Sequence, residues 1–175
     1  KNYYQDWSNT PHPERLARWA KAQKELSMNY PEDTDAAAFH ALAHLAIAPK
    51  ADKSFTNHKE AGAILEKINR EAPKHPAGYH YLIHAYDNPL LAEKALEAAR
   101  GYGSIAPEVP HALHMPTHIF VRLGLWDEVI DWNTRSAEAA WNQPVGEATS
   151  LHFAHAIDYL VYGYMQHGNE TKAVE

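Results

Sequence analysis

The sequence predicts an all-α protein built as an α-solenoid, a stack of antiparallel helix hairpins. Apolar residues recur with helical spacing along most of the chain, no segment shows the alternation of a β-strand, and short Pro, Gly and Asn clusters separate the helical stretches. With 175 residues and 45% hydrophobic content, the chain is long and apolar enough to bury a core as a single domain.

The apolar periodicity predicts eight helices, with ends placed to within about 2–4 residues. In chain order they cover 13–29, 35–47, 55–72, 77–87, 89–102, 112–123, 126–141 and 147–167. The Lys- and Glu-rich stretches 14–25 and 59–71 are typical of the solvated faces of outer helices. The five tryptophans are expected in the packing between helices.

Recurring small residues, glycines and prolines pair these helices into hairpins. Small residues let two helices approach closely, and a proline a few positions later ends the second helix. The patterns are Ala61-x3-Leu65-x2-Ile68-x4-Pro73, Ala95-x3-Ala99-x2-Tyr102-x4-Pro107, Phe120-x3-Gly124-x-Trp126-x2-Val129-Ile130 and Tyr164-x3-Gly168-x4-Ala173-Val174.

These patterns resemble the tetratricopeptide repeat, which has a period of about 34 residues and a tight glycine turn between its helices. The resemblance implies a right-handed superhelix whose first helices line a concave surface. It divides the domain 1–175 into a partial repeat 1–31, repeats at about 32–75, 76–109 and 110–146, and a partial repeat 147–175. Because the chain opens at Lys1 rather than Met, we expect a fragment of a longer protein.

A narrower resemblance comes from two histidine-bearing segments. Residues 79–85 read Tyr-His-Tyr-Leu-Ile-His-Ala, and residues 111–119 read His-Ala-Leu-His-Met-Pro-Thr-His-Ile. They are similar to a group of bacterial tetratricopeptide-type proteins that carry an HxxxH helix followed by HxxHMPxHI. This resemblance implies the fold and draws attention to the histidines, but it implies no activity.

Histidines recur in pairs one helical turn apart. Residues four apart on a helix share one face, so each pair presents two imidazoles side by side. On the repeat alignment all the pairs fall on first helices, which predicts a histidine-lined groove. The pairs are His40 and His44, His80 and His84, and His114 and His118.

This register predicts a site for a divalent transition metal, with Zn, Cu, Fe and Ni as candidates. Neutral imidazole binds all of these metals, and the chain has no cysteine to supply a thiolate. Three or four ligands suffice for zinc. The favoured set is His80, His84, His114 and His118. The residues that could replace them, or accept hydrogen bonds that orient the imidazoles, are His40, His44, Asp87 and His155.

Asp87 joins this set because it follows His84 by three residues and His80 by seven. That spacing returns it to within about 20° of His80 on a helix. Two imidazoles and one carboxylate on a stripe are the ingredients of a 2-His-1-carboxylate site.

His111 adds a further candidate ligand. It falls within roughly 60° of His114 and His118 if the helix begins by Pro110. Pro116 has no N–H to donate, so the helix can also begin or kink there and leave His111 and His114 on a preceding turn.

In the last unit, His152, His155 and Asp158 are spaced by three and form a slanted stripe. Arg122 follows His118 by one turn and could hold a carboxylate or phosphate, although a solvated or paired arginine is the commoner case.

Two other interpretations of the histidines stay open. They could form a hydrogen-bonded network with tyrosines that only rigidifies the helices. They could also contact a peptide, a partner protein or a small molecule bound in the concave groove. The tyrosines available to such a network are Tyr79, Tyr81, Tyr86, Tyr159 and Tyr162.

Missing motifs and charge exclude several function classes. The chain lacks HExxH, GxSxG, GxxxxGK[ST] and GxGxxG, which leaves a metal-assisted reaction as the remaining catalytic class. The net charge of −6 and the scattered acidic residues argue against nucleic-acid partners. No apolar run approaches the roughly 20 residues of a membrane span. The sequence thus predicts a soluble chain and fits either the cytoplasm or the periplasm.

Overall fold

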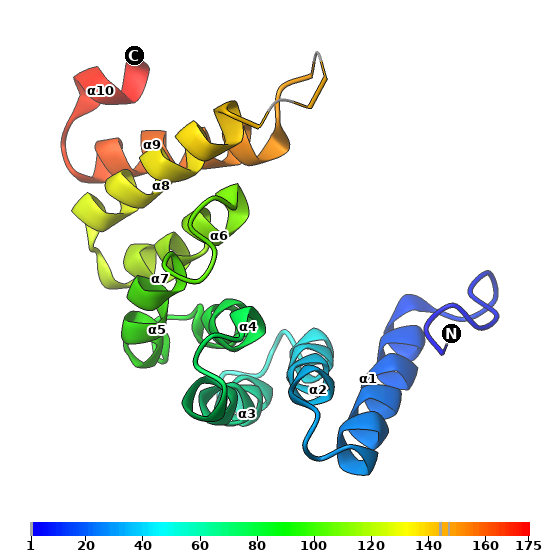
Figure 1. Ribbon diagram of the computed structural model, residues 1–175. Coiled ribbons are helices and arrows are strands. Elements are labelled where there is room, and N and C mark those ends of the chain that lie inside the picture. The colour runs from blue at the N-terminus through cyan, green and yellow to red at the C-terminus, as the bar shows by residue number, and fades with distance from the viewer. Residues whose placement is uncertain (1, 144, 147) are drawn as a thin grey trace. The chain divides into compact units, whose positions relative to one another are not determined.

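The computed structural model describes residues 2–143, 145–146 and 148–175. Within these ranges the elements are helices, and the only strand-like pairing is an isolated bridge between Val145 and Ala148. The predicted all-α class is confirmed. The chain divides into two compact units, residues 1–85 and 86–175 (Figure 1). The sequence-based division into one domain with repeats stays a prediction.

The N-terminal unit holds α1 (His12–Asn29), α2 (Thr34–Ala46), α3 (Thr56–Glu71) and nearly all of α4 (Pro76–Tyr86). Helix α2 packs against both α1 and α3. It begins at a side-chain cap, in which the Asp33 carboxylate accepts a hydrogen bond from the Ala36 N–H at 3.0 Å. Its buried residues are all alanines, Ala36, Ala38, Ala41 and Ala43, which lets the neighbouring helices approach closely.

The connection between α2 and α3, residues 47–55, is long for a link between two helices of a hairpin. The Asp52 carboxylate accepts hydrogen bonds from the backbone N–H groups of Ser54 at 2.8 Å and Thr56 at 3.0 Å. Phe55, in the left-handed region with φ of 55°, precedes the first residue of α3. The side chain of Asp52 therefore takes the place of the usual tight turn and fixes where α3 begins.

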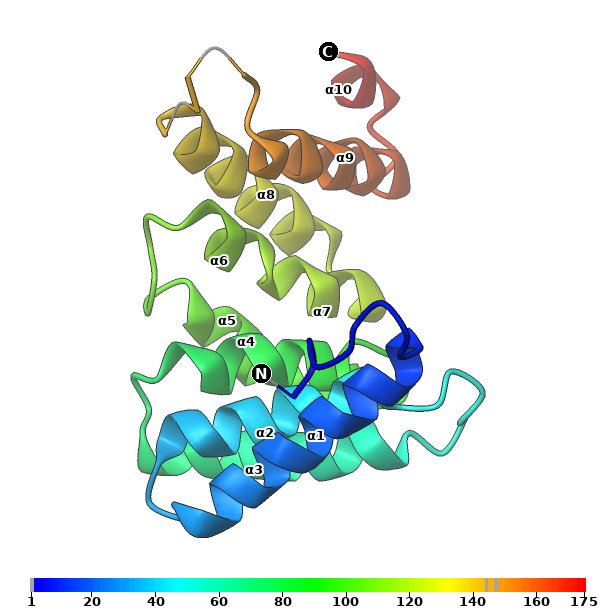
Figure 2. The same cartoon turned by 90° about the vertical axis from the view of Figure 1, so that its right-hand side faces the viewer.

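The C-terminal unit has seven elements within its described residues. They are η1 (Ala92–Ala95), α5 (Leu96–Tyr102), α6 (Pro110–His114), α7 (Pro116–Leu123), α8 (Trp126–Trp141), α9 (Leu151–Gln166) and α10 (Glu170–Val174). Figures 1 and 2 show α9 alongside α8, and α6 and α7 also pack against α8. Between α7 and α8 the chain turns at Gly124, which has a φ of 69°. This confirms the glycine turn predicted there.

The predicted helix 89–102 differs from the structure. The Asn88 side chain accepts hydrogen bonds from the backbone N–H groups of Leu90 and Leu91, and this turn delays the start of regular helix. A short 3-10 segment follows from Ala92, and the α-helix begins only at Leu96.

The predicted helix 112–123 is divided into α6 and α7 at Met115. Pro116 has no N–H to donate to the preceding turn, and the Thr117 hydroxyl donates to the His114 carbonyl at 2.7 Å. Met115 nevertheless keeps helical dihedrals, φ −52° and ψ −40°. The helical register therefore continues across the break, and His114 and His118 stay on one face.

Close packing joins α8 to α9. A Cβ added at Gly163 would meet Val129 Cγ1 at 3.1 Å and Ile130 Cγ1 at 3.2 Å, which is tighter than ordinary contact. Glycine thus lets the two backbones approach at this point. Among the described residues, no helix combines the length and the apolar character that crossing a membrane requires.

Candidate metal centre

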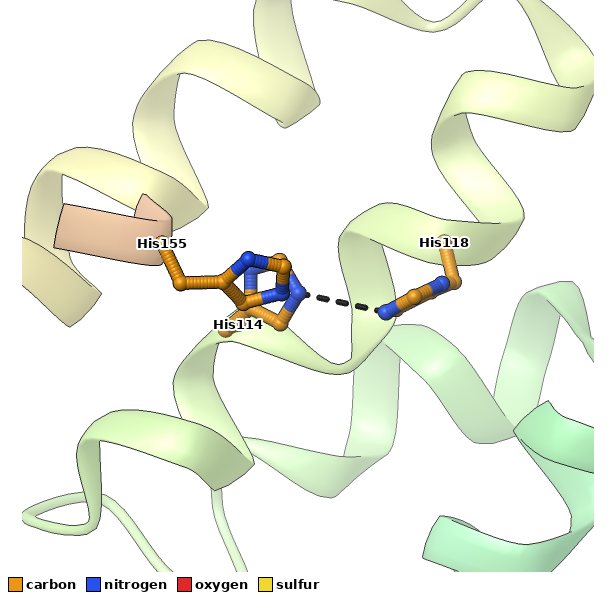
Figure 3. Close-up of side chains that lie close together, drawn as sticks. All are labelled: His114, His118 and His155. Carbon is orange, nitrogen blue, oxygen red and sulfur yellow. Dashed lines mark hydrogen bonds between the residues drawn. The ribbon is translucent and has the colours of Figure 1, made fainter. Parts of the chain in front are cut away.

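Three histidines from three helices of the C-terminal unit converge. His114 is the last residue of α6, His118 lies in α7 and His155 in α9. One ring nitrogen from each lies within 4.8 Å of the others. Among the described residues, these three histidines are the group close enough together to hold one metal ion. Figure 3 shows His118 pointing towards His114 and His155. His114 is buried, His118 partly buried and His155 exposed.

The hydrogen bonds of His114 fix which of its nitrogens carries the proton. Its Nδ1 lies 2.8 Å from Asn133 Oδ1. The Asn133 amide nitrogen donates to the Val129 carbonyl at 2.8 Å, so the amide oxygen accepts and His114 Nδ1 donates. The lone pair of the neutral ring is therefore on Nε2.

His118 is held in the same way by a carboxylate. Its Nδ1 lies 3.1 Å from Asp87 Oδ2, and because an ionised carboxylate only accepts, Nδ1 donates. Arg122 Nε donates to the other carboxylate oxygen at 2.7 Å and anchors Asp87. The lone pair of the neutral His118 ring is also on Nε2.

These two Nε2 atoms lie 3.1 Å apart. In these neutral tautomers two lone pairs would face each other, a repulsion that either a metal ion between the rings or a proton on one Nε2 removes. In a tetrahedral zinc site with Zn–N bonds of about 2.0–2.1 Å, two ligand nitrogens lie roughly 3.3 Å apart. The spacing and the tautomers therefore match those of two imidazoles on one transition metal, each oriented by an acceptor on its far nitrogen.

A proton cannot easily replace the metal at His114. Burial, with smaller contributions from the neighbouring His118, His155 and His111, lowers the pKa of His114 to about 3 against the opposing hydrogen bond to Asn133. His114 is consequently neutral at physiological pH, which is the form that binds metals.

Asp87 keeps its charge although it is partly buried. Burial would raise its pKa, but the hydrogen bonds from His118 and Arg122, together with the positive charge of Arg122 and that of His118 when it is protonated, outweigh burial and hold the pKa below its usual value. The sequence placed Asp87 on a stripe with His80 and His84. In the C-terminal unit its carboxylate contacts His118, which is the orienting role also expected for it, and its role as a ligand stays a prediction.

Tyr159 of α9 packs against all three histidine rings. Its ring centroid lies 4.6 Å from that of His114, 5.5 Å from His118 and 5.3 Å from His155. Burial, followed by the charge of Asp87, raises the pKa of its phenol, so Tyr159 stays neutral. This confirms Tyr159 as a neighbour of the histidines.

A cleft of about 410 Å³ borders the centre. It gives a water molecule or another ligand access to the side of the centre formed by His118. Its lining residues are Asp87, His118, Val121, Arg122, Asp158, Tyr159 and Tyr162.

The other predicted histidine pairs lie in the N-terminal unit. The Nε2 atoms of His80 and His84 on α4 are 3.1 Å apart, which confirms that this pair shares a face. On α2 the rings of His40 and His44 are 6.2 Å apart, and His44 Nε2 lies 2.7 Å from the Glu60 carboxylate of α3. The favoured four-histidine set and the groove draw on both units, and they stay predictions.

Two residues that define these environments have no clear sequence signal. Asn133 lies on α8, an outer helix, and only its complete burial marks it as the partner of His114. Glu60 belongs to a Lys- and Glu-rich stretch that predicts a solvated face. His155, expected as a replacement ligand, belongs to the centre itself, whereas His111 stacks beside His114 with ring centroids 6.2 Å apart.

No protein-family model matches the chain, and no curated protein matches it in sequence. Solved structures of the protein MamA do share its fold. One superposes with a TM-score of 0.70 at 14% identity over 92% of this chain and 84% of that chain. MamA from Desulfovibrio magneticus RS-1, residue 41 to the end, gives 0.65 at 13% identity over 93% and 80%. The likeness shows that the chain shares the all-α fold of these structures.

Proposed function

We propose that this chain is a tetratricopeptide-like scaffold that binds a transition metal ion through His114, His118 and His155. The observation that carries the proposal is the 3.1 Å approach of the His114 and His118 Nε2 atoms, each on a ring whose Nδ1 is held by an acceptor. A protonated His118 would instead donate from Nε2 to His114 Nε2, and the metal content of the protein separates these two interpretations.

The ligand set supports a borderline metal. Three imidazoles without a thiolate suit Zn²⁺, Cu²⁺, Ni²⁺ or Fe²⁺. With three protein ligands, zinc keeps a fourth position for water or another ligand, and the cleft beside His118 offers a path to it. Activation of a bound water would make the centre catalytic, and hydrolysis assays on the metal-loaded protein test that use.

The test is the metal content of untagged protein after incubation with zinc and gel filtration, measured by plasma mass spectrometry. We expect about one ion per chain for the wild type. We expect none for the double variant His118→Ala/His155→Ala. Neither side chain is fully buried, so this variant should keep its helical circular dichroism.

The matched control is His167→Ala, which removes an exposed histidine of the same unit that pairs with Asp127 rather than with the centre. It should bind as much zinc as the wild type. Equal zinc content in the double variant and the control would refute the proposed centre.

A second candidate function is binding of a peptide or partner protein. Solenoids of this kind present extended surfaces for such contacts. Helix α9 exposes Ile157, Val161 and Met165, which are spaced by four residues and form an apolar row, with Tyr162 beside it. Peptides selected on the wild type should lose binding to Val161→Glu/Met165→Glu while its zinc content stays unchanged. Retained binding would argue against this surface.

A further inference from the structure

A second histidine pair adjoins the proposed centre within the C-terminal unit. His111 precedes His114 by three residues on α6, and His152 precedes His155 by three residues on α9. The rings of His111 and His152 face each other with centroids 5.5 Å apart, and those of His114 and His155 are 4.3 Å apart. The two helices therefore hold two successive histidine pairs between them.

The geometry of the outer pair suits a shared ion. With Zn–N bonds of about 2.0–2.1 Å, two imidazoles on one tetrahedral ion have ring centroids roughly 5 Å apart. The 5.5 Å between His111 and His152, with their planes inclined by 41°, lies close to that value. Two imidazoles leave the remaining positions of the ion to water.

Exposure decreases along α6 from His111 to His114, while His152 and His155 on α9 are both exposed. His152 is exposed and His111 is partly buried, whereas His114 is only 2% exposed. The rings of His111 and His114 are stacked with centroids 6.2 Å apart. The outer pair thus adjoins His114, a ligand of the proposed centre.

We propose that His111 and His152 form a loading site, which binds a hydrated divalent transition metal ion from solvent and passes it to His114, His118 and His155. The proposal rests on the proposed function. Transfer is a ligand exchange, in which imidazole nitrogens replace bound waters and no electron moves. Its direction follows from ligand number, since three imidazoles hold the ion more tightly than two.

The test is a titration of wild type and His152→Ala with zinc chloride, monitored by calorimetry. We expect the wild type to bind one tight and one weaker ion. His152→Ala should keep the tight site and weaken the second at least about tenfold, because loss of even a hydrogen-bond partner of a metal ligand costs about 10–100-fold in affinity. His167→Ala should titrate like the wild type.

A stopped-flow experiment tests the transfer itself. Zinc is supplied from a coloured chelator, and the rate at which the tight site fills is followed. We expect slower filling in His152→Ala than in His167→Ala, with the same final zinc content. His111→Gln should slow filling in the same way.

The outcomes separate the two proposals. If the wild type binds no zinc, the proposed centre fails, and the loading site fails with it. If the wild type binds zinc but His152→Ala fills its tight site at the wild-type rate with unchanged stoichiometry, only the loading site is refuted. Loss of both ions in His152→Ala would also refute it, because His152 would then belong to the centre itself.

Discussion

The histidine pairs on α2 and on α6–α7 share the same spacing but differ in their surroundings. On α2, a carboxylate from the neighbouring helix lies 2.7 Å from His44 Nε2, and the rings of His40 and His44 are 6.2 Å apart. On α6–α7, Asn133 and Asp87 occupy the Nδ1 atoms, and the Nε2 atoms meet at 3.1 Å. Spacing sets a shared face, but the neighbouring acceptors decide which nitrogen can bind a metal.

Lowering the pH should reveal the largest difference between the two pairs, in the free energy of unfolding. The pKa of His114, about 3 in the folded chain, lies below the 6.5 usual for an unfolded one. Between these values the unfolded chain binds a proton that the folded chain does not, so stability falls as the pH decreases from about 6.5 towards 3. The loss should be on the order of several kcal/mol, since one pKa unit is worth about 1.4 kcal/mol.

Urea unfolding in EDTA, measured at a series of pH values, checks this expectation. The glutamine side chain in His114→Gln cannot be protonated. The free energy of unfolding of this variant should therefore depend less on pH than that of the wild type between pH 6.5 and 3. His44→Gln, in the half-buried pair on α2, serves as the control and should retain the steep profile. A wild-type profile that is flat between pH 6.5 and 4 would contradict the burial of a neutral His114.

The next largest effect is expected from Asn133, whose side-chain oxygen accepts the hydrogen bond from His114 Nδ1. Asn133→Leu keeps a similar volume but leaves the His114 Nδ1–H buried without an acceptor. We expect a loss of about 1–3 kcal/mol in the free energy of unfolding. Zinc affinity should fall about 10–100-fold, as for other residues that orient a metal-binding histidine. Calorimetric zinc titration and urea unfolding measure the two effects, and unchanged zinc affinity would show that Asn133 does not orient the ligand.

The smallest effect is expected at the α2 pair. Glu60→Gln removes the charge beside His44 on an exposed surface, and such pairs contribute about 0.2–1 kcal/mol. Zinc binding by the C-terminal unit should not change. A loss of zinc in Glu60→Gln would mean that the α2 pair takes part in the metal site, and it would remove the contrast between the two pairs.

Much of the fold could be predicted because helical periodicity is a local property. Helices α1, α2, α3, α4 and α8 begin and end within one residue of the predicted limits. The differences arise where side chains compete with the backbone. Asn88 caps a turn ahead of α5, and Pro116 divides the helix that carries His114 and His118. Helix α9 begins at Leu151, four residues later than predicted.

The site could be predicted only in part. Sequence spacing brings His114 and His118 together, since both lie on one helical face. It indicates His155 only as a replacement ligand, because the approach of His155 to the other two requires the packing of α9 against α6. It cannot assign Asn133, since the choice between Nδ1 and Nε2 depends on an acceptor from α8.

Gly163 sets how closely α8 and α9 approach each other near the proposed centre. His155 is carried by α9, whereas Asn133, which orients His114, is carried by α8, and these helices touch where Gly163 meets Val129. A methyl group there would push the helices apart and widen the gap that an ion must fill. In the proposed centre, the choice among ions of different radius would therefore depend partly on Gly163, which lies two turns from His155 and has no donor atom. Helix packing as well as ligand chemistry would then set the selectivity of that centre.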